Sequence, residues 1–264
     1  MNILALSLFS AGLYCCGTIY QFLVYTRKLH AKPFISFFLG AAAVSAQLIV
    51  TFHYIFAQTQ INLSLVNTAS LTSCLIIICL LLLSTRKPLQ IIFLAVYPFA
   101  TLTVLSTLFF QQQQPDLSSA GSGIFIHVIL SILAYSVFSI AAVQAILIQM
   151  QNKNLKRKNS TILMRNLPPL LTMENLLFEM LWSGTILLFM AIIAGFIFVD
   201  DLFAQHLIHK TVLSIIALGI FSVLLAGRKI HGWRGLTASK WTLWGGAMLM
   251  LAFFGSKFVL EWLV

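Results

Sequence analysis

The chain alternates between long apolar runs and short polar breaks. Eight runs are candidate membrane spans, at residues 3–25, 34–56, 64–84, 89–110, 124–149, 181–199, 211–227 and 241–262. A helix needs about 20 mainly apolar residues to cross the hydrocarbon core of a bilayer. The pattern therefore predicts an all-α, polytopic membrane protein with eight transmembrane helices in a single domain, residues 1–264.

Polar or turn-forming segments mark the ends of these runs. The longest break predicts a cytoplasmic loop at residues 150–180. Within it, Pro168 and Pro169 interrupt any helix. The segment LLTMENLLFEMLW that follows is predicted to form a short helix along the inner interface, with Thr172 as its N-cap. Pro98 predicts a kink in the fourth span.

Composition supports a membrane protein. Hydrophobic residues make up 60% of the chain and charged residues only 8%, whereas soluble domains carry about 25% charged residues. The net charge of +10 would suggest nucleic-acid binding in a soluble chain. Here the cations flank apolar spans, where they set orientation, so nucleic acid is not expected as a partner.

The cations determine the predicted orientation. Of the sixteen Lys and Arg residues, fourteen lie in alternate loops. They are Arg27, Lys28, Lys32, Arg86, Lys87, Lys153, Lys156, Arg157, Lys158, Arg165, Arg228, Lys229, Arg234 and Lys240. Cytoplasmic loops carry the excess of Lys and Arg, so these loops are predicted inside and both termini outside. The segment DDLFAQHLIHK, residues 200–210, then faces outward.

The first apolar run is predicted to be a retained span, because its first cations, Arg27 and Lys28, follow it and do not precede it. Cysteines lie only within apolar runs and form no C-x-x-C pair, which predicts neither a disulfide framework nor a zinc site. No carboxylate falls at mid-membrane, which argues against a proton- or sodium-coupled carrier.

No nucleophile–base pair, phosphate-binding loop or pair of carboxylates at acid–base spacing is found in the sequence. The sequence therefore predicts a protein that is not an enzyme, with no catalytic residue and no metal site.

The histidines are the candidate ligand-binding residues of the chain. Four of the six, His53, His127, His206 and His209, fall at the outer level of the membrane. Neutral imidazole is a common ligand for transition metals and for haem iron. A histidine at a helix end can equally be an ordinary interface residue. The other two, His30 and His231, lie in cytoplasmic loops and are expected to be solvated.

Polar residues recur along two of the predicted spans. The fifth span carries His127, Ser131, Tyr135 and Ser139 at intervals of four residues. The third span carries Ser64, Asn67, Ser70 and Cys74. Such stripes line an inward-facing site or join neighbouring helices through small and polar side chains, and both roles can hold at once.

Several segments together resemble a known family. They are IHVILSILAYSVFSIAA (126–142), HKTVLSIIALGIFSVLLAGRKIHGWRG (209–235), LAFFGSKF (251–258), INLSLVNTASL (61–71) and LPPLLTMENLLFEM (167–180). The chain resembles the cytochrome c assembly family of CcsA/CcmC-type haem-handling membrane proteins, and within it the compact YpjD-type inner-membrane branch. Larger members carry a tryptophan-rich outer loop, whereas residues 200–210 contain no tryptophan.

The resemblance implies a haem-binding or haem-handling protein of the bacterial inner membrane, acting in cytochrome c assembly at the outer face. His127 falls where the family has its first outer iron ligand. The hypothesis is that His127, His209 and His53 converge there and that one or two of them bind haem iron. Lys210 would pair with a haem propionate; alternatively, it forms a surface contact with Asp200 or Asp201.

Two other functions remain open. One is a transporter or export accessory for a small solute or metal ion. The other is a structural partner that docks a cytoplasmic domain through the fifth-to-sixth-span loop. The expected partners are membrane lipid, haem and other cytochrome assembly proteins.

Overall fold

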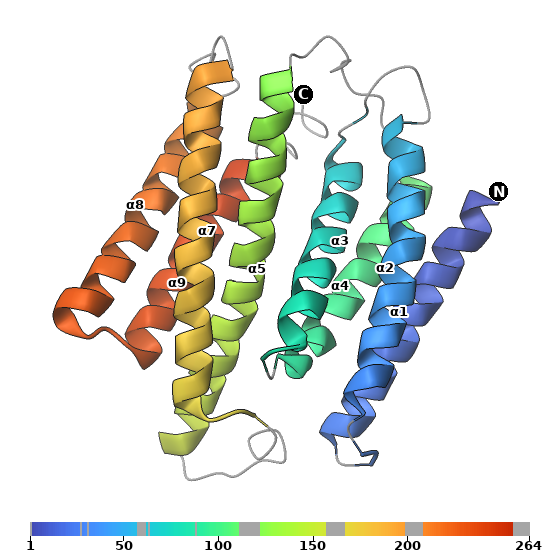
Figure 1. Cartoon of the computed structure of the whole chain (residues 1–264), viewed down its shortest axis with the longest axis horizontal. Helices are drawn as coiled ribbons and strands as arrows, with labels where there is room; N and C mark the ends of the chain where they lie inside the picture. Colours follow the sequence, from blue (N-terminus) through green and yellow to red (C-terminus); the bar gives the residue numbers. More distant parts are fainter. Residues whose placement is uncertain are drawn as a thin grey trace. The chain divides into compact units, whose positions relative to one another are not determined.

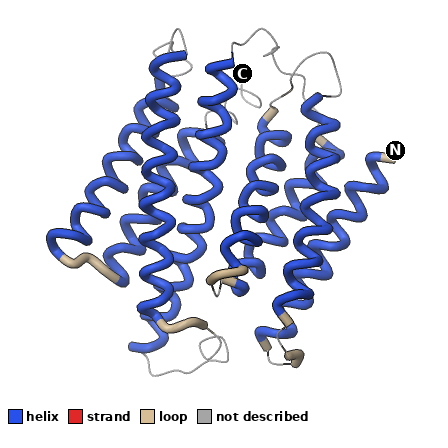
Figure 2. Tube along the Cα trace, viewed as in Figure 1, coloured by secondary structure: helices blue, strands red, loops and turns tan. Residues whose placement is uncertain are grey.

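The described part of the chain is helical throughout and contains no strand (Figure 2). The computed structural model describes residues 2–26, 28–30, 32–56, 62, 64–87, 89–110, 122–156, 167–198 and 208–255. Its elements are α1 (Ile3–Tyr25), α2 (Pro33–Phe56), α3 (Leu65–Ser84), the 3₁₀ helix η1 (Gln90–Ile92), α4 (Phe93–Phe109), α5 (Ser122–Lys156), α7 (Leu170–Phe198), α8 (Ile208–His231), α9 (Gly235–Met250) and the π-helix η2 (Leu251–Gly255). The prediction of an all-α fold is confirmed.

Seven of these helices are long and apolar enough to cross a membrane, within the described residues. The chain is therefore a multi-pass membrane protein. The helix α9 is 16 residues long and continues into the five-residue π-helix η2. The predicted eighth span, 241–262, runs past residue 255 into residues that lie outside the described part of the chain.

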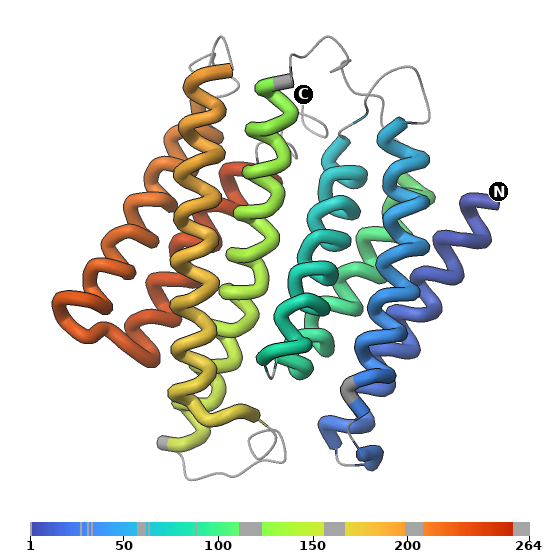
Figure 3. Tube along the Cα trace, viewed as in Figure 1, coloured from blue at the N-terminus to red at the C-terminus, as the bar shows by residue number. Residues whose placement is uncertain are grey.

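The helices form two units. The first unit contains α1 to α4, and the second contains α5, α7, α8, α9 and η2 (Figures 1 and 3). Within each unit, consecutive long helices run in opposite directions. The loops α1–α2 and α3–α4 therefore share one end of the first unit, and the α8–α9 turn lies at the same end of the second unit as the start of α7. The single domain predicted from the sequence stays a prediction, and each of the two units is described by itself.

Tyr97 of α4 is central to the core of the first unit. It is fully buried, and it occupies space that two glycines leave open. A Cβ atom added at Gly17 of α1 would lie 2.8 Å from Cε2 of Tyr97, and one at Gly40 of α2 would lie 2.5 Å from its hydroxyl. The Tyr97 hydroxyl donates a 3.0 Å hydrogen bond to the carbonyl of Ser36.

A buried polar network joins all four helices of this unit. Its centre is Gln47 of α2, whose Oε1 accepts a 2.7 Å hydrogen bond from the Tyr14 hydroxyl of α1. The Gln47 amide donates to Ser73 of α3 at 2.8 Å, and Ser73 in turn is 2.8 Å from the Thr103 hydroxyl of α4. Ser70, from the predicted polar stripe, accepts another hydrogen bond from Gln47 at 3.1 Å. In α3 this stripe therefore holds helices together.

Two stacked phenylalanines form the centre of the second unit. The rings of Phe138 in α5 and Phe221 in α8 are 4.0 Å apart and nearly parallel. Gly184 of α7 faces Phe138, where an added Cβ would lie 3.0 Å from the ring. Gly245 of α9 faces Phe221, where an added Cβ would lie 2.6 Å from the ring. The two glycines let α7 and α9 approach the stacked pair closely.

The predicted interfacial helix is instead the beginning of α7. This helix runs without a break through residues 170–198, and α5 extends to Lys156, so helix occupies much of the predicted 150–180 loop. The first turn of α7 starts from Pro169, whose carbonyl oxygen accepts a 3.1 Å hydrogen bond from the Met173 amide. The predicted N-cap, Thr172, lies inside the helix. Burial of residues 173, 176, 177 and 178 explains why this segment continues as one helix and does not turn along the interface.

Candidate functional site

His127 is held by a neighbouring helix. Its Nδ1 lies 2.7 Å from the main-chain carbonyl oxygen of Ala191 in α7. Because a carbonyl oxygen can only accept a hydrogen bond, Nδ1 must carry the proton. In the neutral ring, Nε2 then keeps its lone pair for a ligand. The side chain is half-buried, which fits a site between helices better than a freely solvated residue.

Small residues on α7 allow this contact. Ala191, Ala194 and Gly195 are buried, and α5 packs along α7 in the second unit. Larger side chains would separate the two helix backbones, and the histidine ring would then no longer reach a main-chain oxygen.

Two serines of the polar stripe on α5 form hydrogen bonds within that helix. The Ser131 hydroxyl donates to the His127 carbonyl, and the Ser139 hydroxyl donates to the Tyr135 carbonyl, each at 2.8 Å. Both serines therefore bond to their own helix. Tyr135 is buried in the second unit. Its ring lies 4.8 Å from that of Phe253 in the π-helix η2.

The other predicted ligands have different environments. His209 and Lys210 lie in the first turn of α8, where His209 is exposed and Lys210 is partly exposed. The helices α5 and α8 begin at the same end of the second unit (Figure 1), so His127 and His209 share that end. In the described residues, no hydrogen bond or ring contact joins these two histidines.

The remaining histidines lie elsewhere in the chain. His53 is exposed in the last turn of α2, in the first unit, and its ring meets that of Tyr54 edge-on at 5.6 Å. His206 lies outside the described residues, as do the acidic residues Asp200 and Asp201. Convergence of His53 with the second unit stays a prediction.

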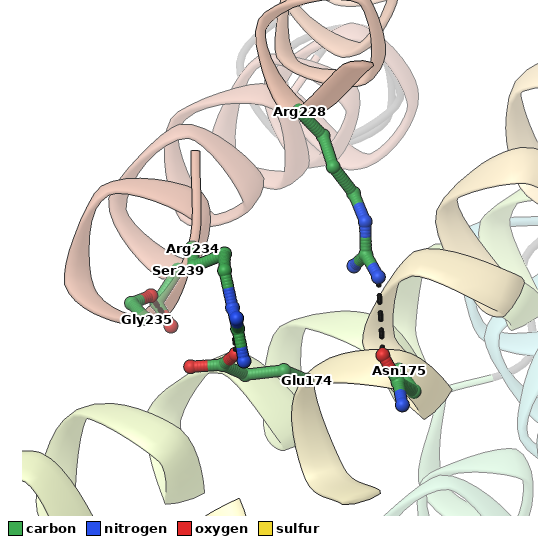
Figure 4. Close-up of polar contacts among 6 residues, drawn as sticks. All are labelled: Glu174, Asn175, Arg228, Arg234, Gly235 and Ser239. Atoms are coloured by element: carbon green, nitrogen blue, oxygen red, sulfur yellow. Dashed lines mark hydrogen bonds and ion pairs between the residues drawn. The ribbon is translucent and has the colours of Figure 1, made fainter. Parts of the chain in front are cut away.

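A second polar cluster, which the sequence did not predict as a unit, lies at the opposite end of the second unit, where α8 ends and α7 begins (Figure 1); Figure 4 shows its side chains. Nε of Arg234 forms a 3.0 Å ion pair with Oε2 of Glu174. The Glu174 side chain is only 6% exposed, whereas that of Arg234 is 57% exposed. Nη2 of Arg228 donates to Oδ1 of Asn175 at 3.0 Å, and the Arg228 guanidinium lies 3.7 Å above the Phe178 ring. These contacts attach the α8–α9 turn to α7.

The turn depends on two glycines with left-handed backbone. Gly232 has φ +66 and Gly235 has φ +55, a region that other residues adopt at a cost in free energy. An added Cβ at Gly235 would lie 3.4 Å from Oε1 of Glu174. The carboxylate therefore lies at the N-terminus of α9, where the helix dipole favours negative charge. The clue in the sequence was a carboxylate soon after the Pro168–Pro169 break and an arginine in the cation-rich break before the last apolar run.

Fold and site together define the class of protein. The described chain is a multi-pass α-helical membrane protein with an oriented, half-buried histidine at one end of its second unit.

Comparison with known proteins then gives the family. Residues 35–264 match the family described as cytochrome C assembly protein, and the chain belongs to this family.

The chain is also similar to individual curated proteins. The chain is 30% identical over 226 residues to "Inner membrane protein YpjD" of Escherichia coli (strain K12), covering 83% of this chain and 86% of the relative. It is 26% identical over 196 residues to "Uncharacterized 28.8 kDa protein in nifR3-like 5'region" of Azospirillum brasilense, covering 73% and 72%. It is 28% identical over 131 residues to "Protein HemX" of Brevibacillus brevis, covering 49% and 48%. No solved structure matches the chain.

Proposed function

We propose that this chain is a haem-binding, haem-handling membrane protein that acts in cytochrome c assembly at the outer face of the bacterial inner membrane. Membership of the cytochrome C assembly protein family supports the process. The similarity to a relative named as an inner membrane protein supports the location. The observation that carries haem binding is the hydrogen bond from His127 to Ala191.

The proposed topology has eight spans with both termini outside. It rests on the cation bias, because cytoplasmic loops carry the excess of Lys and Arg. Arg228 and Arg234 lie at the end of the second unit opposite to His127. If that end is cytoplasmic, the beginning of α5 and of α8 faces outward, together with His127, His209 and Lys210.

The residues present fit haem. Histidines that bind a metal usually donate the second ring nitrogen to a carbonyl or carboxylate, which fixes the tautomer and raises the basicity of the ligating nitrogen. His127 has this arrangement through Ala191. Haem would supply an iron that accepts nitrogen ligands, and His127 would be the residue that holds it, through Nε2.

Further residues would complete the haem site. His209 is the candidate for a second ligand within the second unit, while a role for His53 remains the expectation from the sequence. The Lys210 ammonium would pair with a propionate in a charge-assisted contact.

In this proposal the chain binds or handles haem without catalysing a reaction. Its partners are lipid, haem and other cytochrome assembly proteins.

A haem titration of purified protein tests the proposal. We expect wild-type protein in detergent to take up haem and give a Soret band with a spectrum that changes on reduction. His127→Ala should lose most of this absorbance at equal protein level, because the oriented nitrogen is gone. His30→Ala is the matched control, since His30 is exposed in the α1–α2 loop; it should bind haem as wild type does.

Two outcomes would count against the proposal. Wild-type protein that stays colourless throughout the titration would favour a transporter or export accessory for a small solute or metal ion. If His127→Ala and His209→Ala both keep the wild-type spectrum, haem binding stands but these two residues are not its ligands.

A further inference from the structure

The polar cluster at the α8–α9 turn brings together, among the described residues, two guanidinium groups and one carboxylate. It consists of Arg228, Arg234, Glu174 and Asn175, here called the arginine cluster (Figure 4). Arg228 interacts electrostatically with both Arg234 and Glu174. Two guanidinium groups thus share one carboxylate, and Asn175 is neutral. An anion bound beside them would balance the remaining charge.

The two arginines have donors to spare. Nη1 of Arg228 is buried and has no hydrogen-bond partner within the described residues, and an unpaired buried donor is unfavourable. The Arg234 ion pair uses Nε, on the side of the guanidinium. Its terminal Nη edge remains for a second partner, and the side chain is 57% exposed. A planar guanidinium edge matches the oxygens of a phosphate.

The surroundings of the arginine cluster fit the membrane surface. The rings of Trp233 and Trp241 lie 5.4 Å apart, and tryptophan is enriched at the headgroup level of membranes. Ile230 is 74% exposed and Trp244 is 65% exposed. These apolar side chains offer a surface to acyl chains, which a free phosphate ion would not use.

We propose that the arginine cluster binds the headgroup phosphate of an acidic phospholipid in the inner leaflet. Arg234 contacts the phosphate oxygens through its terminal Nη edge, and Arg228 supplies the second positive charge. Ile230 and Trp244 contact the lipid chain. The anionic inner leaflet attracts basic residues at its surface. In this cluster two guanidinium groups are also held in fixed positions, where they can contact one phosphate specifically. The proposal does not depend on haem binding at the other end of the unit.

Lipid binding to purified full-length protein tests the site. Native mass spectrometry would compare adducts of phosphatidylglycerol and phosphatidylcholine on the wild type and on Arg228→Gln. A second variant, Glu174→Gln with Arg234→Gln, replaces the ion pair by neutral amides and avoids leaving a buried carboxylate alone. Lys229→Gln is the matched control for Arg228→Gln. Lys229 is exposed beside Arg228, and each of these two substitutions removes one positive charge.

We expect wild type to prefer phosphatidylglycerol and both site variants to lose about fivefold in affinity for it, while Lys229→Gln stays near wild type. Wild-type affinity in both site variants would overturn the proposal. An equal loss in Lys229→Gln would overturn it too, because the effect would then be one of general surface charge. Displacement of phosphatidylglycerol by inorganic phosphate at equal concentration would show a free-anion site and no lipid site.

Discussion

At the residue scale, a small number of polar side chains fix positions that the apolar surface leaves open. Apolar attraction is non-directional, so directional hydrogen bonds and ion pairs add constraints on helix position to those that side-chain shape supplies. The His127–Ala191 hydrogen bond fixes the position of α5 against α7. The Glu174–Arg234 ion pair fixes the α8–α9 turn against α7 at the other end.

Reversing the charge of Arg234 should weaken the second unit. Arg234→Glu would place a carboxylate beside the nearly buried Glu174, and like charges repel. Because Arg234 is more than half exposed, water screens part of the effect, and we expect a loss of about 1–2 kcal/mol. Membrane yield and the midpoint of thermal unfolding in detergent would measure it.

The reversed pair provides the control for this prediction. Glu174→Arg combined with Arg234→Glu restores opposite charges and should recover part of the lost stability. Lys229→Glu makes the same charge change at an exposed position and should have little effect. Wild-type yield and midpoint for Arg234→Glu would show that the ion pair does not hold the turn.

At the element scale, glycines decide how closely helices approach. Neighbouring glycines in α9 differ sharply in this respect. A Cβ at Gly245 would lie 2.6 Å from the Phe221 ring, whereas one at Gly246 would lie 3.9 Å from the Ala142 Cβ. Phe221 cannot move away easily, because its other neighbour is the stacked ring of Phe138.

This contrast predicts opposite effects of the same substitution at adjacent positions. Gly245→Ala should destabilise the protein by about 1–3 kcal/mol, because it overpacks a filled core. Gly246→Ala should be neutral or stabilising by up to about 1 kcal/mol, because alanine favours helix over glycine. Unfolding midpoints of the two variants in the same detergent would measure the difference. Equal midpoints would mean that α9 is not held against Phe221 as described.

At the scale of the whole molecule, each unit has its own core. The first is organised by Tyr97 and the Gln47 network, and the second by the Phe138–Phe221 pair. Orientation is a separate property that depends on the distribution of cations between the two sides. It belongs to the entire chain, because each successive span reverses the side reached by the next loop.

Reporter fusions would establish the orientation. Fusions after residues 60, 118 and 205 should behave as external, and those after residues 30, 87, 158 and 234 as cytoplasmic, because the cation-rich loops stay inside. Alkaline phosphatase activity would report external positions and green fluorescence cytoplasmic ones. A cytoplasmic signal at residue 205 would contradict an outer site at His127 and His209.

The sequence by itself determined the all-helical fold, the positions of most spans and the family. Apolar runs of membrane length leave helix as the one way to satisfy main-chain polar groups locally. The sequence also indicated His127 as the leading site residue, because of the polar stripe on α5 and the family resemblance.

Only the tertiary structure decided which partners the polar side chains contact. Ala191, an ordinary small residue in α7, became the hydrogen-bond partner of His127 because α5 packs beside it. Glu174 reached Arg234, 60 positions along the chain, because the α8–α9 turn folds back onto α7. The start of α7 became part of one long helix, and not a separate short helix along the interface, because its apolar residues are buried. Local pattern determines which segments are helical, but contacts between distant residues depend on how the helices pack, and helix packing depends on shape complementarity along the whole interface.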